Sequence, residues 1–389
     1  MTQEFEFGEE IVALRAMVRE FCAEQAPEST VRTAMESELG HDPALWRRFG
    51  SELGVFGLAV PESDGGDGAG LVPHAVVVEE FGAALVCGPT LGALCLALPA
   101  LIALPDAQAR QDYLPGLIAG ELIATLAAPT VHGVFDPEAA TVSATTGPGG
   151  WTLSGGLAHV PDGASADILL VPARTQEGLA LFAVERGAAG LAHTDLFTMD
   201  RTRRQATFEL ADTPARLVAD EVAAPAVCAR AVRVATALLA VSQVGGAQRM
   251  LDVTVQHVRT RIQFGQAVGA FQAVKHRCAN MLMEVEQARS AAYHAVWALD
   301  SDSEIDDPDL AVALAKAVAS DAFTSITRAA IQLHGGIGFT WEGSPQLYFK
   351  RATADLVTLG TGTEQVENVA RLVLDRRVAA ANVPEPTLT

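Results

Sequence analysis

Two segments near the C-terminal end of the chain combine residue types that suit the binding of a phosphorylated ligand with a ring system. In the first segment, Arg261 is closely followed by Phe264 and Gly265, and then by Gln272. A guanidinium can make a forked, charge-assisted contact with a pyrophosphate. Phe264 offers an apolar face to a ring, and Gln272 offers an amide to a sugar or a phosphate.

The second segment runs from Gln332 to Thr340 and contains the pair Gly335-Gly336. Because glycine has no Cβ, such a pair lets another molecule approach the backbone closely. Taken singly, the two segments also fit a plainer interpretation, namely a helix end at the glycines and a surface arginine. Familiar alternatives are missing from the sequence, since it holds no P-loop, no Gly-x-Gly-x-x-Gly and no His-Glu-x-x-His. The histidines are scattered without metal-ligand spacing, so we expect no metal site.

The elements that must position these segments follow from the hydrophobic pattern. A helical hydrophobic pattern dominates residues 11–104. After residue 120 the sequence shows short apolar runs separated by Gly, Pro and Asp, which is typical of strands. The helical pattern resumes near residue 226. We therefore predict a helical domain at 1–120, a β domain at 121–225 and a helical bundle at 226–389. Long helices are expected at Ala235–Arg259, Gln272–Leu299, Asp309–Leu333 and Glu364–Arg377. An acidic surface loop at 301–309 and a frayed tail at 383–389 complete the plan.

Composition narrows the function classes. The chain has 389 residues, a formal net charge of −20 and 49% hydrophobic residues, which fits a globular multi-domain protein. The negative charge argues against nucleic acid or an anionic membrane as a partner. Five cysteines without regular spacing, and an acidic N-terminus without a signal sequence, favour a cytoplasmic protein with reduced thiols. The apolar stretch Leu85–Leu104 is interrupted by Pro89 and Pro99, so we predict a buried broken helix and no membrane span.

Together with this helical–β–helical plan, the two segments resemble the acyl-CoA dehydrogenase family. Three further stretches match the family in the same order along the chain. They are Leu53-Gly54-x-x-Gly57-Leu58-x-x-Pro61-Glu62 with Gly65-Gly66, Tyr113-Leu114-Pro115 with Gly120-Glu121, and Leu153-Ser154-Gly155 with Ala166-Asp167. The resemblance implies an α+β fold with an N-terminal helical domain, a middle β-sandwich or barrel, and a C-terminal four-helix bundle.

The resemblance also implies FAD as the cofactor, with its ADP half held across a subunit interface. The residues that it assigns to FAD are Arg261, Phe264, Gln272, Gln332, Gly335 and Gly336, with Gly360 and Thr361 suited to a phosphate or ribityl contact. The flavin-ring end departs from the family. A Leu-Thr-Glu-Pro-like segment is replaced by Leu126-Ala-Ala-Pro129, and a Trp-Ile-Thr-like segment by His159-Val-Pro161. His159 either stacks on or hydrogen-bonds the flavin, or is a solvent-facing strand residue.

The catalytic base of the family is missing. Dehydrogenation of an acyl-CoA requires a carboxylate within reach of the α-proton. Family members place this glutamate at one of two positions, which here are Leu359, ahead of Gly360-Thr361, and Ala235. The nearest carboxylates, Glu364 and Asp355, are displaced along the chain, so we assign no catalytic residue. The resemblance further implies that the backbone N–H at position 359, which would hold the thioester oxygen, survives the change to leucine.

Three interpretations remain open. The first is a base-lacking subunit of a mixed acyl-CoA dehydrogenase, in which a homologous partner chain supplies the glutamate. The expected assembly is a heterotetramer, with a homo-oligomer as the alternative. An electron-transfer acceptor is expected as a further partner. The second is a self-sufficient oxidase or monooxygenase of the same fold, and the third is a non-catalytic scaffold. The phosphates of the acyl-CoA substrate could meet basic residues that are otherwise ordinary surface charges, namely Arg201, Arg203, Arg204, Arg230 and Arg233.

Overall fold

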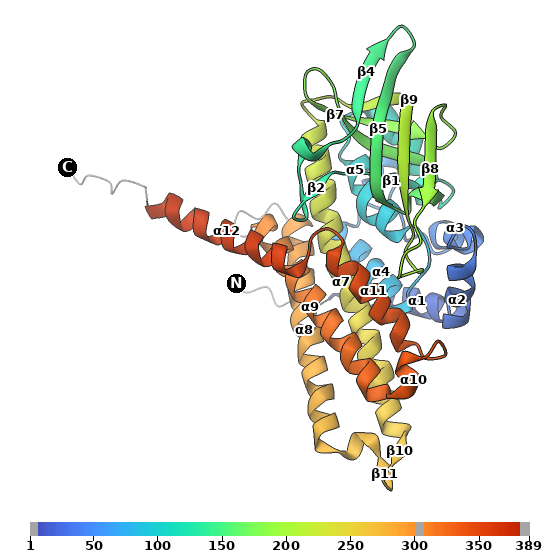
Figure 1. Cartoon of the computed structure of the whole chain (residues 1–389), viewed down its shortest axis with the longest axis vertical. Helices are drawn as coiled ribbons and strands as arrows, with labels where there is room; N and C mark the ends of the chain where they lie inside the picture. The colour runs from blue at the N-terminus through green and yellow to red at the C-terminus, as the bar shows by residue number, and fades with distance from the viewer. Residues whose placement is uncertain (1–6, 301–306, 382–389) are drawn as a thin grey trace, which may run out of the picture.

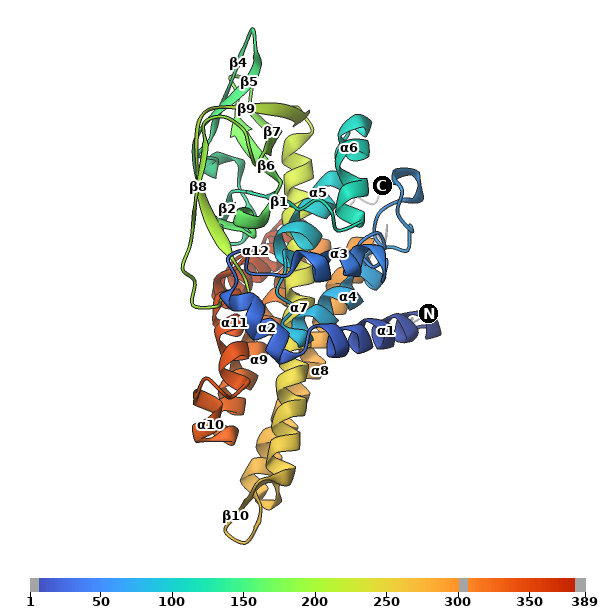
Figure 2. The same ribbon diagram turned by 90° about the vertical axis from the view of Figure 1, so that its right-hand side faces the viewer.

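The structure is a computed structural model that describes residues 7–300 and 307–381. Most of the acidic loop predicted at 301–309, and the tail predicted at 383–389, lie outside these ranges. The described chain divides into a β domain at one end, a long helical bundle below it and smaller helices on one side (Figure 1). The N-terminal helices pack beside the middle of the bundle, as the view turned by 90° shows (Figure 2).

The N-terminal part is helical, as predicted. Its helices are α1 (Glu9–Gln25), α2 (Glu28–Glu36), α3 (Pro43–Ser51), α4 (Leu71–Ala84), α5 (Leu98–Ile102) and α6 (Ala107–Ile118), with a 3-10 turn η1 (Glu62–Asp64) and a π-helix η2 (Thr90–Ala97). The apolar stretch is indeed buried and interrupted at Pro89, which directly precedes η2. No second break occurs at Pro99, because this residue lies in the first turn of α5, where a proline needs no N–H donor.

The middle part is a β domain. Its strands are β1 (Ala124–Leu126), β4 (Ser143–Gly147), β5 (Gly150–Pro161), β6 (Ile168–Arg174), β7 (Leu179–Glu185), β8 (Leu191–Asp195) and β9 (Gln205–Ala219), which form one 7-stranded sheet. A separate hairpin is formed by β2 (Thr130–Val131) and β3 (Val134–Phe135), and a short turn η3 (Pro137–Ala139) follows it. Alternating buried side chains fill the interior, including Leu153, Phe182 and Phe208.

The sheet closes into a barrel. Strands β4, β5, β9, β7 and β6 are paired in that order, and the pairing of Ser143 in β4 with Arg174 in β6 completes the ring. Strand β1 pairs with β6, and β8 pairs with β9. Closure pairs the edges that an open sheet would leave exposed. It also places the end of β1 and the end of β5 on the side of the barrel that faces the helices.

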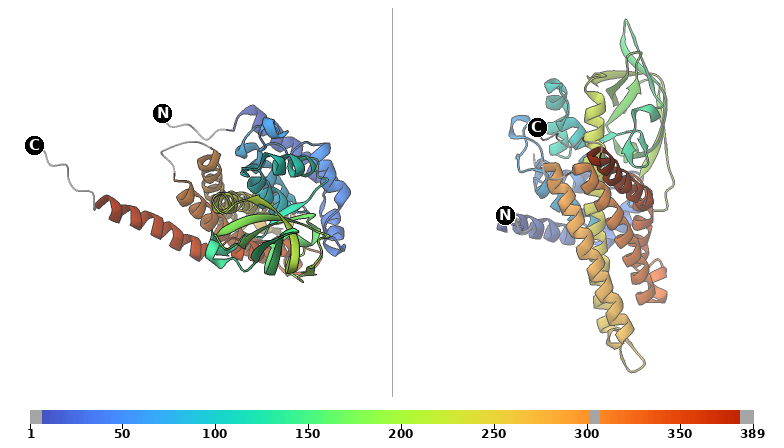
Figure 3. Two further views of the ribbon diagram at one scale, coloured as in Figure 1. Left: turned by 90° about the horizontal axis from the view of Figure 1, so that it is seen from above. Right: turned by 90° about the vertical axis from the view of Figure 1, so that its left-hand side faces the viewer.

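The C-terminal part is helical. Its elements are α7 (Ala224–Thr260), α8 (Gln272–Asp300), α9 (Pro308–His334), α10 (Gly336–Phe339), α11 (Pro345–Val357) and α12 (Gly362–Ala381), with a hairpin of β10 (Ile262–Gln263) and β11 (Gln266–Ala267) and a turn η5 (Val268–Ala270). Helices α7, α8 and α9 pack against one another, and α11 and the beginning of α12 pack against α9. The far end of α12 extends away from the rest of the molecule (Figure 3). The sequence pattern did not predict α11, and α7 begins eleven residues earlier than expected, at Ala224 rather than Ala235.

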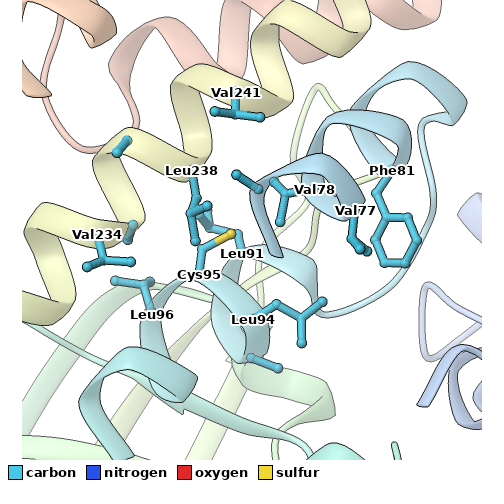
Figure 4. Close-up of a cluster of buried hydrophobic side chains, with 14 of the residues drawn as sticks. Val77, Val78, Phe81, Leu91, Leu94, Cys95, Leu96, Val234, Leu238 and Val241 are labelled. Carbon is cyan, nitrogen blue, oxygen red and sulfur yellow. The ribbon is translucent and has the colours of Figure 1, made fainter. Parts of the chain in front are cut away.

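The main core lies where α4, η2 and α7 meet. Figure 4 shows Val78, Leu91, Leu94, Cys95 and Leu238 converging there from the three helices. Helices α7 and α9 are long and apolar enough to cross a membrane by length and composition alone, but 72% of the apolar stretch in each is buried inside the protein. Burial within a bundle accounts for their apolar character.

Candidate cofactor and substrate site

A cavity of about 550 Å³ lies between the barrel and the helical bundle. Three stretches that are distant in the sequence contribute to its lining, namely 126–130 from the end of β1 onward, 157–161 at the end of β5, and 357–359 from the end of α11 onward. These are the stretches that the family resemblance assigns to the flavin ring and to one position of the base. The fold therefore brings together the ring-end residues predicted from the sequence.

Leu359 lines this cavity with a left-handed backbone, at φ 54°. The next residue, Gly360, has φ 90° and is buried against the hairpin β2–β3. In that hairpin, a Cβ added to Gly133 would lie 2.4 Å from the Leu359 carbonyl oxygen and 2.8 Å from the Cα of Gly360. The hairpin thus packs on the 359–360 turn at a distance that only glycine permits.

Thr361 and Glu364 form a capping box at the start of α12. The Thr361 N–H donates to Oε2 of Glu364 at 2.7 Å, and the Glu364 N–H donates to Oγ1 of Thr361 at 3.2 Å. The other carboxylate oxygen of Glu364 lies 3.0 Å from Nδ1 of His132. The hydrogen bond from His132, followed by that from the Thr361 N–H, lowers the pKa of Glu364. Glu364 is therefore a helix cap and does not line the cavity.

His159 lines the cavity from β5. Its backbone has φ 53° and lies at a register irregularity between Leu157 and Val160, where a bulge redirects a side chain. The side chain is exposed, with Nδ1 3.3 Å from Oε1 of Gln205, which also lines the cavity. His159 is the titratable side chain among the described residues that line this cavity; they include no aspartate or glutamate.

Asp355, the other carboxylate considered as a base, is buried in a cluster of charges. Its carboxylate pairs with Arg203, and its backbone carbonyl accepts from Nζ of Lys316 at 2.8 Å. One turn earlier, Nε of Arg351 donates to Oδ2 of Asp200 at 2.7 Å. Burial lowers the pKa of Lys316 to about 8. Because its carboxylate is paired with Arg203 and lies outside the cavity, Asp355 is not placed to take a proton from a substrate there.

Ala235, at the second base position, is fully buried within α7 and belongs to the hydrophobic core. It does not line the cavity between the barrel and the bundle. Among the described residues, neither base position therefore carries a carboxylate, and no other carboxylate replaces it in the cavity lining.

The predicted ADP-end residues lie at the opposite end of the helical bundle from the barrel (Figure 1). Arg261 follows the last turn of α7, and Gly336 begins α10; both line a groove of about 590 Å³. Ser344 and Pro345, at the start of α11, line the same groove, whereas Val357, at the end of α11, lines the cavity near the barrel. At a rise of 1.5 Å per residue, α11 separates the two sites by roughly 20 Å.

The remaining predicted residues are exposed and do not line this groove. Phe264 is 92% exposed in the tight turn between β10 and β11, with φ 51°. Gln272 begins α8, and Gln332 lies in the last turn of α9; both are exposed. A Cβ added at Gly335 or Gly336 would meet nothing within 4 Å, so the glycines leave open space above the backbone. The cavity near the barrel, and the groove with Arg261 and its open glycine backbone, fit the two ends of FAD.

Two of the five arginines treated as surface charges are in fact integrated into the structure. Arg203 is buried in its ion pair with Asp355, and Arg204 donates to the carbonyl of Ser37 at 2.8 Å and to that of Met35 at 3.1 Å. Arg233 is paired with Asp309 at 2.6 Å, whereas Arg230 is exposed. The sequence alone did not show the buried cluster, because its members come from separate segments. The capping box, in contrast, was visible as Thr361-x-x-Glu364.

Comparison with known proteins agrees with this architecture. Residues 8–121 match the acyl-CoA dehydrogenase N-terminal domain, and residues 225–374 match the acyl-CoA dehydrogenase C-terminal domain. Acyl-CoA dehydrogenase IpdE2 of Mycolicibacterium smegmatis is 34% identical over 368 residues, which cover 93% of this chain and 98% of that protein.

Two solved structures are similar over almost their whole length. A chain of the Tcur3481–Tcur3483 steroid ACAD has a TM-score of 0.85 and 31% identity, covering 95% of this chain and 99% of that chain. A chain of the ChsE4–ChsE5 complex from Mycobacterium tuberculosis has a TM-score of 0.86 and 28% identity, covering 98% and 100%. The chain therefore belongs to the acyl-CoA dehydrogenase family of flavoprotein oxidoreductases, and its cofactor is FAD.

Proposed function

We propose that this chain is the base-lacking subunit of a mixed acyl-CoA dehydrogenase, in which a homologous partner chain supplies the catalytic glutamate. The observation that carries the proposal is the lining of the cavity near the barrel, where Leu359 occupies the position of the base and no described lining residue is acidic. General-base assistance is typically worth about 10²–10⁴-fold in rate. A chain without a base should therefore dehydrogenate an acyl-CoA very slowly by itself.

The position of the two sites supports a division of labour between chains. The groove with Arg261 and the cavity with Leu359 lie at opposite ends of α11. The ADP-end residues follow the family pattern, whereas the ring-end residues Ala127 and His159 depart from it. We infer that this chain binds the ADP half of an FAD whose ring reacts beside the partner's base.

The chemistry then divides as follows. Bound FAD would supply the acceptor for the hydride that leaves the β-carbon of the acyl group. Arg261 of this chain neutralises charge on the diphosphate and so fixes the position of the nucleotide. The glutamate of the partner removes the α-proton. The exposed apolar side chains around the groove, Ile262, Phe264, Ile337 and Phe339, are suited to burial against that partner.

The similarity to a steroid ACAD and to a chain of a two-component complex supports both the substrate class and the assembly. We propose an acyl-CoA formed during steroid degradation as the substrate, and the cytoplasm as the location of the enzyme.

The test compares this chain alone with the same chain co-expressed with a family member that has a glutamate at the position of Leu359 or Ala235. Turnover of steroid-derived acyl-CoA thioesters is followed by reduction of an artificial electron acceptor. We expect activity only for the pair, and its loss when the partner's glutamate is changed to glutamine. Light scattering should show a hetero-oligomer. Robust turnover by this chain alone, or a pair that stays active without the partner's glutamate, would refute the proposal.

A further inference from the structure

Two histidines to which the family resemblance assigns no role lie in the groove with Arg261; His334 stands within the second segment, and His257 stands just before the first. His257 is one helical turn before Arg261 on α7, and His334 is the last residue of α9. Their rings are stacked, with centroids 4.3 Å apart and planes inclined by 22°. Both side chains line the groove, together with Arg261, Gly336 and Glu342.

The tautomer of His334 follows from its neighbour. Its Nδ1 lies 2.7 Å from the carbonyl oxygen of Ala330, one turn earlier on α9. A carbonyl oxygen can only accept, so Nδ1 carries the proton and the neutral ring keeps Nε2 as its acceptor. Protonation of Nε2 would turn that nitrogen into a second donor and make the ring a cation, without breaking the bond to Ala330.

The protein surroundings of the two rings favour their neutral forms at physiological pH. Burial, then the nearby His334 and Arg261, lower the pKa of His257. Burial also lowers the pKa of His334. Glu342, in the loop before α11, is the acidic side chain that lines the groove, and Arg261 is the basic one. An anion seated between the rings and Arg261 would reverse this balance, because an opposite charge within a few ångströms favours the protonated imidazole.

We propose that His257 and His334 form a second contact to the FAD diphosphate, beside Arg261, and that this stacked pair takes up a proton from solvent when the nucleotide binds. The inference deepens the proposed function, since it rests on the assignment of this groove to the ADP half of FAD. The diphosphate is anionic and needs more than one donor. The two rings add donors on the wall of the groove formed by the ends of α7 and α9.

The sign of the pH dependence follows from linkage. Bound diphosphate raises the pKa of a contacting histidine above its value in the empty groove. The gain in affinity is then complete below the pKa that the histidine has without the ligand. It is lost as the pH rises through the higher pKa that the histidine has in the complex. FAD should therefore bind more tightly as the pH falls from 8 to 6, by roughly five- to tenfold for one proton taken up over part of this range.

The experiment measures FAD binding to the purified assembly after flavin removal, by quenching of flavin fluorescence at several pH values between 6 and 8. Calorimetry in two buffers of different ionisation enthalpy counts the protons taken up. His257→Phe and His334→Phe keep an aromatic ring in the stack but remove the nitrogens. We expect the wild-type assembly to show the pH slope and proton uptake, and each variant to lose most of both.

The controls separate the possible failures. His193→Gln, on β8 of the barrel, should keep the wild-type slope. Arg261→Ala should weaken FAD binding at every pH; if it has no effect, the groove is not the diphosphate site and the inference falls with that assignment. If Arg261→Ala weakens binding while both phenylalanine variants keep the wild-type slope, the stack is only packing and the inference is wrong. If His334→Phe does not fold, His257→Phe decides. None of these readouts depends on which chain supplies the base.

Discussion

The backbone N–H of Thr361 donates to Oε2 of Glu364 at 2.7 Å, and this bond closes the capping box that begins α12. Glu364 is the first carboxylate after the vacant base position at Leu359. Its two oxygens contact Thr361 and His132. The carboxylate nearest downstream is therefore structural.

We predict that Glu364→Gln leaves the turnover of the assembled enzyme within about twofold, because glutamine keeps the capping box. Glu364→Ala, which removes the Glu364 half of the capping box but leaves the Thr361 hydroxyl as the cap, should cost about 0.5–1.5 kcal/mol of unfolding free energy. The pKa of Glu364 is lower in the folded protein than in the unfolded chain. The contribution of this carboxylate to the free energy of unfolding is therefore present above its ordinary pKa and is lost as the pH falls through its pKa in the folded protein. Urea denaturation at pH 7 and pH 4, with steady-state assays, checks both points. A loss of turnover of 10²-fold or more in Glu364→Gln would identify it as the base.

Arg203→Met should be strongly destabilising, because it leaves the buried carboxylate of Asp355 without its partner. Breaking one side of a buried ion pair typically costs about 3–5 kcal/mol. The matched control is Arg216→Met, which breaks the exposed pairs with Asp112 and Asp106 and should cost less than about 1 kcal/mol. Urea denaturation of the two variants measures the difference. Equal losses of unfolding free energy in the two variants would show that the buried ion pair stabilises the protein no more than the exposed pairs do.

Asp162→Asn should stabilise the protein at pH 7 and above. Burial raises the pKa of Asp162 to about 6, and Oδ2 accepts from the Gly92 N–H at 2.8 Å. An unfolded aspartate has a pKa of about 3.9, so native stability falls as the pH rises through the range between these values. Asparagine keeps an acceptor and tolerates the left-handed backbone at φ 55°. The gain should be on the order of 1–3 kcal/mol at pH 8 and vanish near pH 4, as measured by thermal unfolding across this range.

Gly133→Ala should disturb the cavity near the barrel, because the new Cβ would collide with the Leu359 carbonyl. We expect a loss of about 1–3 kcal/mol, with displacement of the hairpin β2–β3. Gly54→Ala is the matched control: this glycine also has a positive φ, 68°, but open space around it. Its cost should be limited to the backbone term of about 1 kcal/mol. Thermal unfolding compares the pair, and a cost at Gly133 no larger than at Gly54 would contradict the close packing.

The sequence predicted the helical–β–helical plan because hydrophobic periodicity is a local property. Helix α8 begins at Gln272, as expected, and strands such as β6 (Ile168–Arg174) lie in the region after residue 120 where short apolar runs were expected. The helical region expected from about residue 226 agrees with α7, which begins at Ala224, although the individual helix was predicted only from Ala235. The sequence pattern missed α11, which begins at Pro345 directly after a stretch with glycines that are typical of a loop.

Part of the candidate site was predicted because its residues belong to local motifs that resemble the family. From the family pattern, Leu359 was assigned to a position of the base and His159 to the ring end, and the fold places both in one cavity. The pairing of Arg203 with Asp355 was not predictable, since it joins residues 152 positions apart and neither neighbourhood carries a motif. The stack of His257 on His334 depends in the same way on how the ends of α7 and α9 meet.

The loop between β8 and β9 carries Asp200 and Arg203 out of the barrel and into contact with α11, where they pair with Arg351 and Asp355. The barrel is therefore not an exchangeable module. A chimera whose barrel comes from a relative with other residues at the positions of Asp200 and Arg203 would leave Arg351 and Asp355 buried on α11 without their partners. Recombination within this family should succeed only where the loop and α11 are inherited from the same parent.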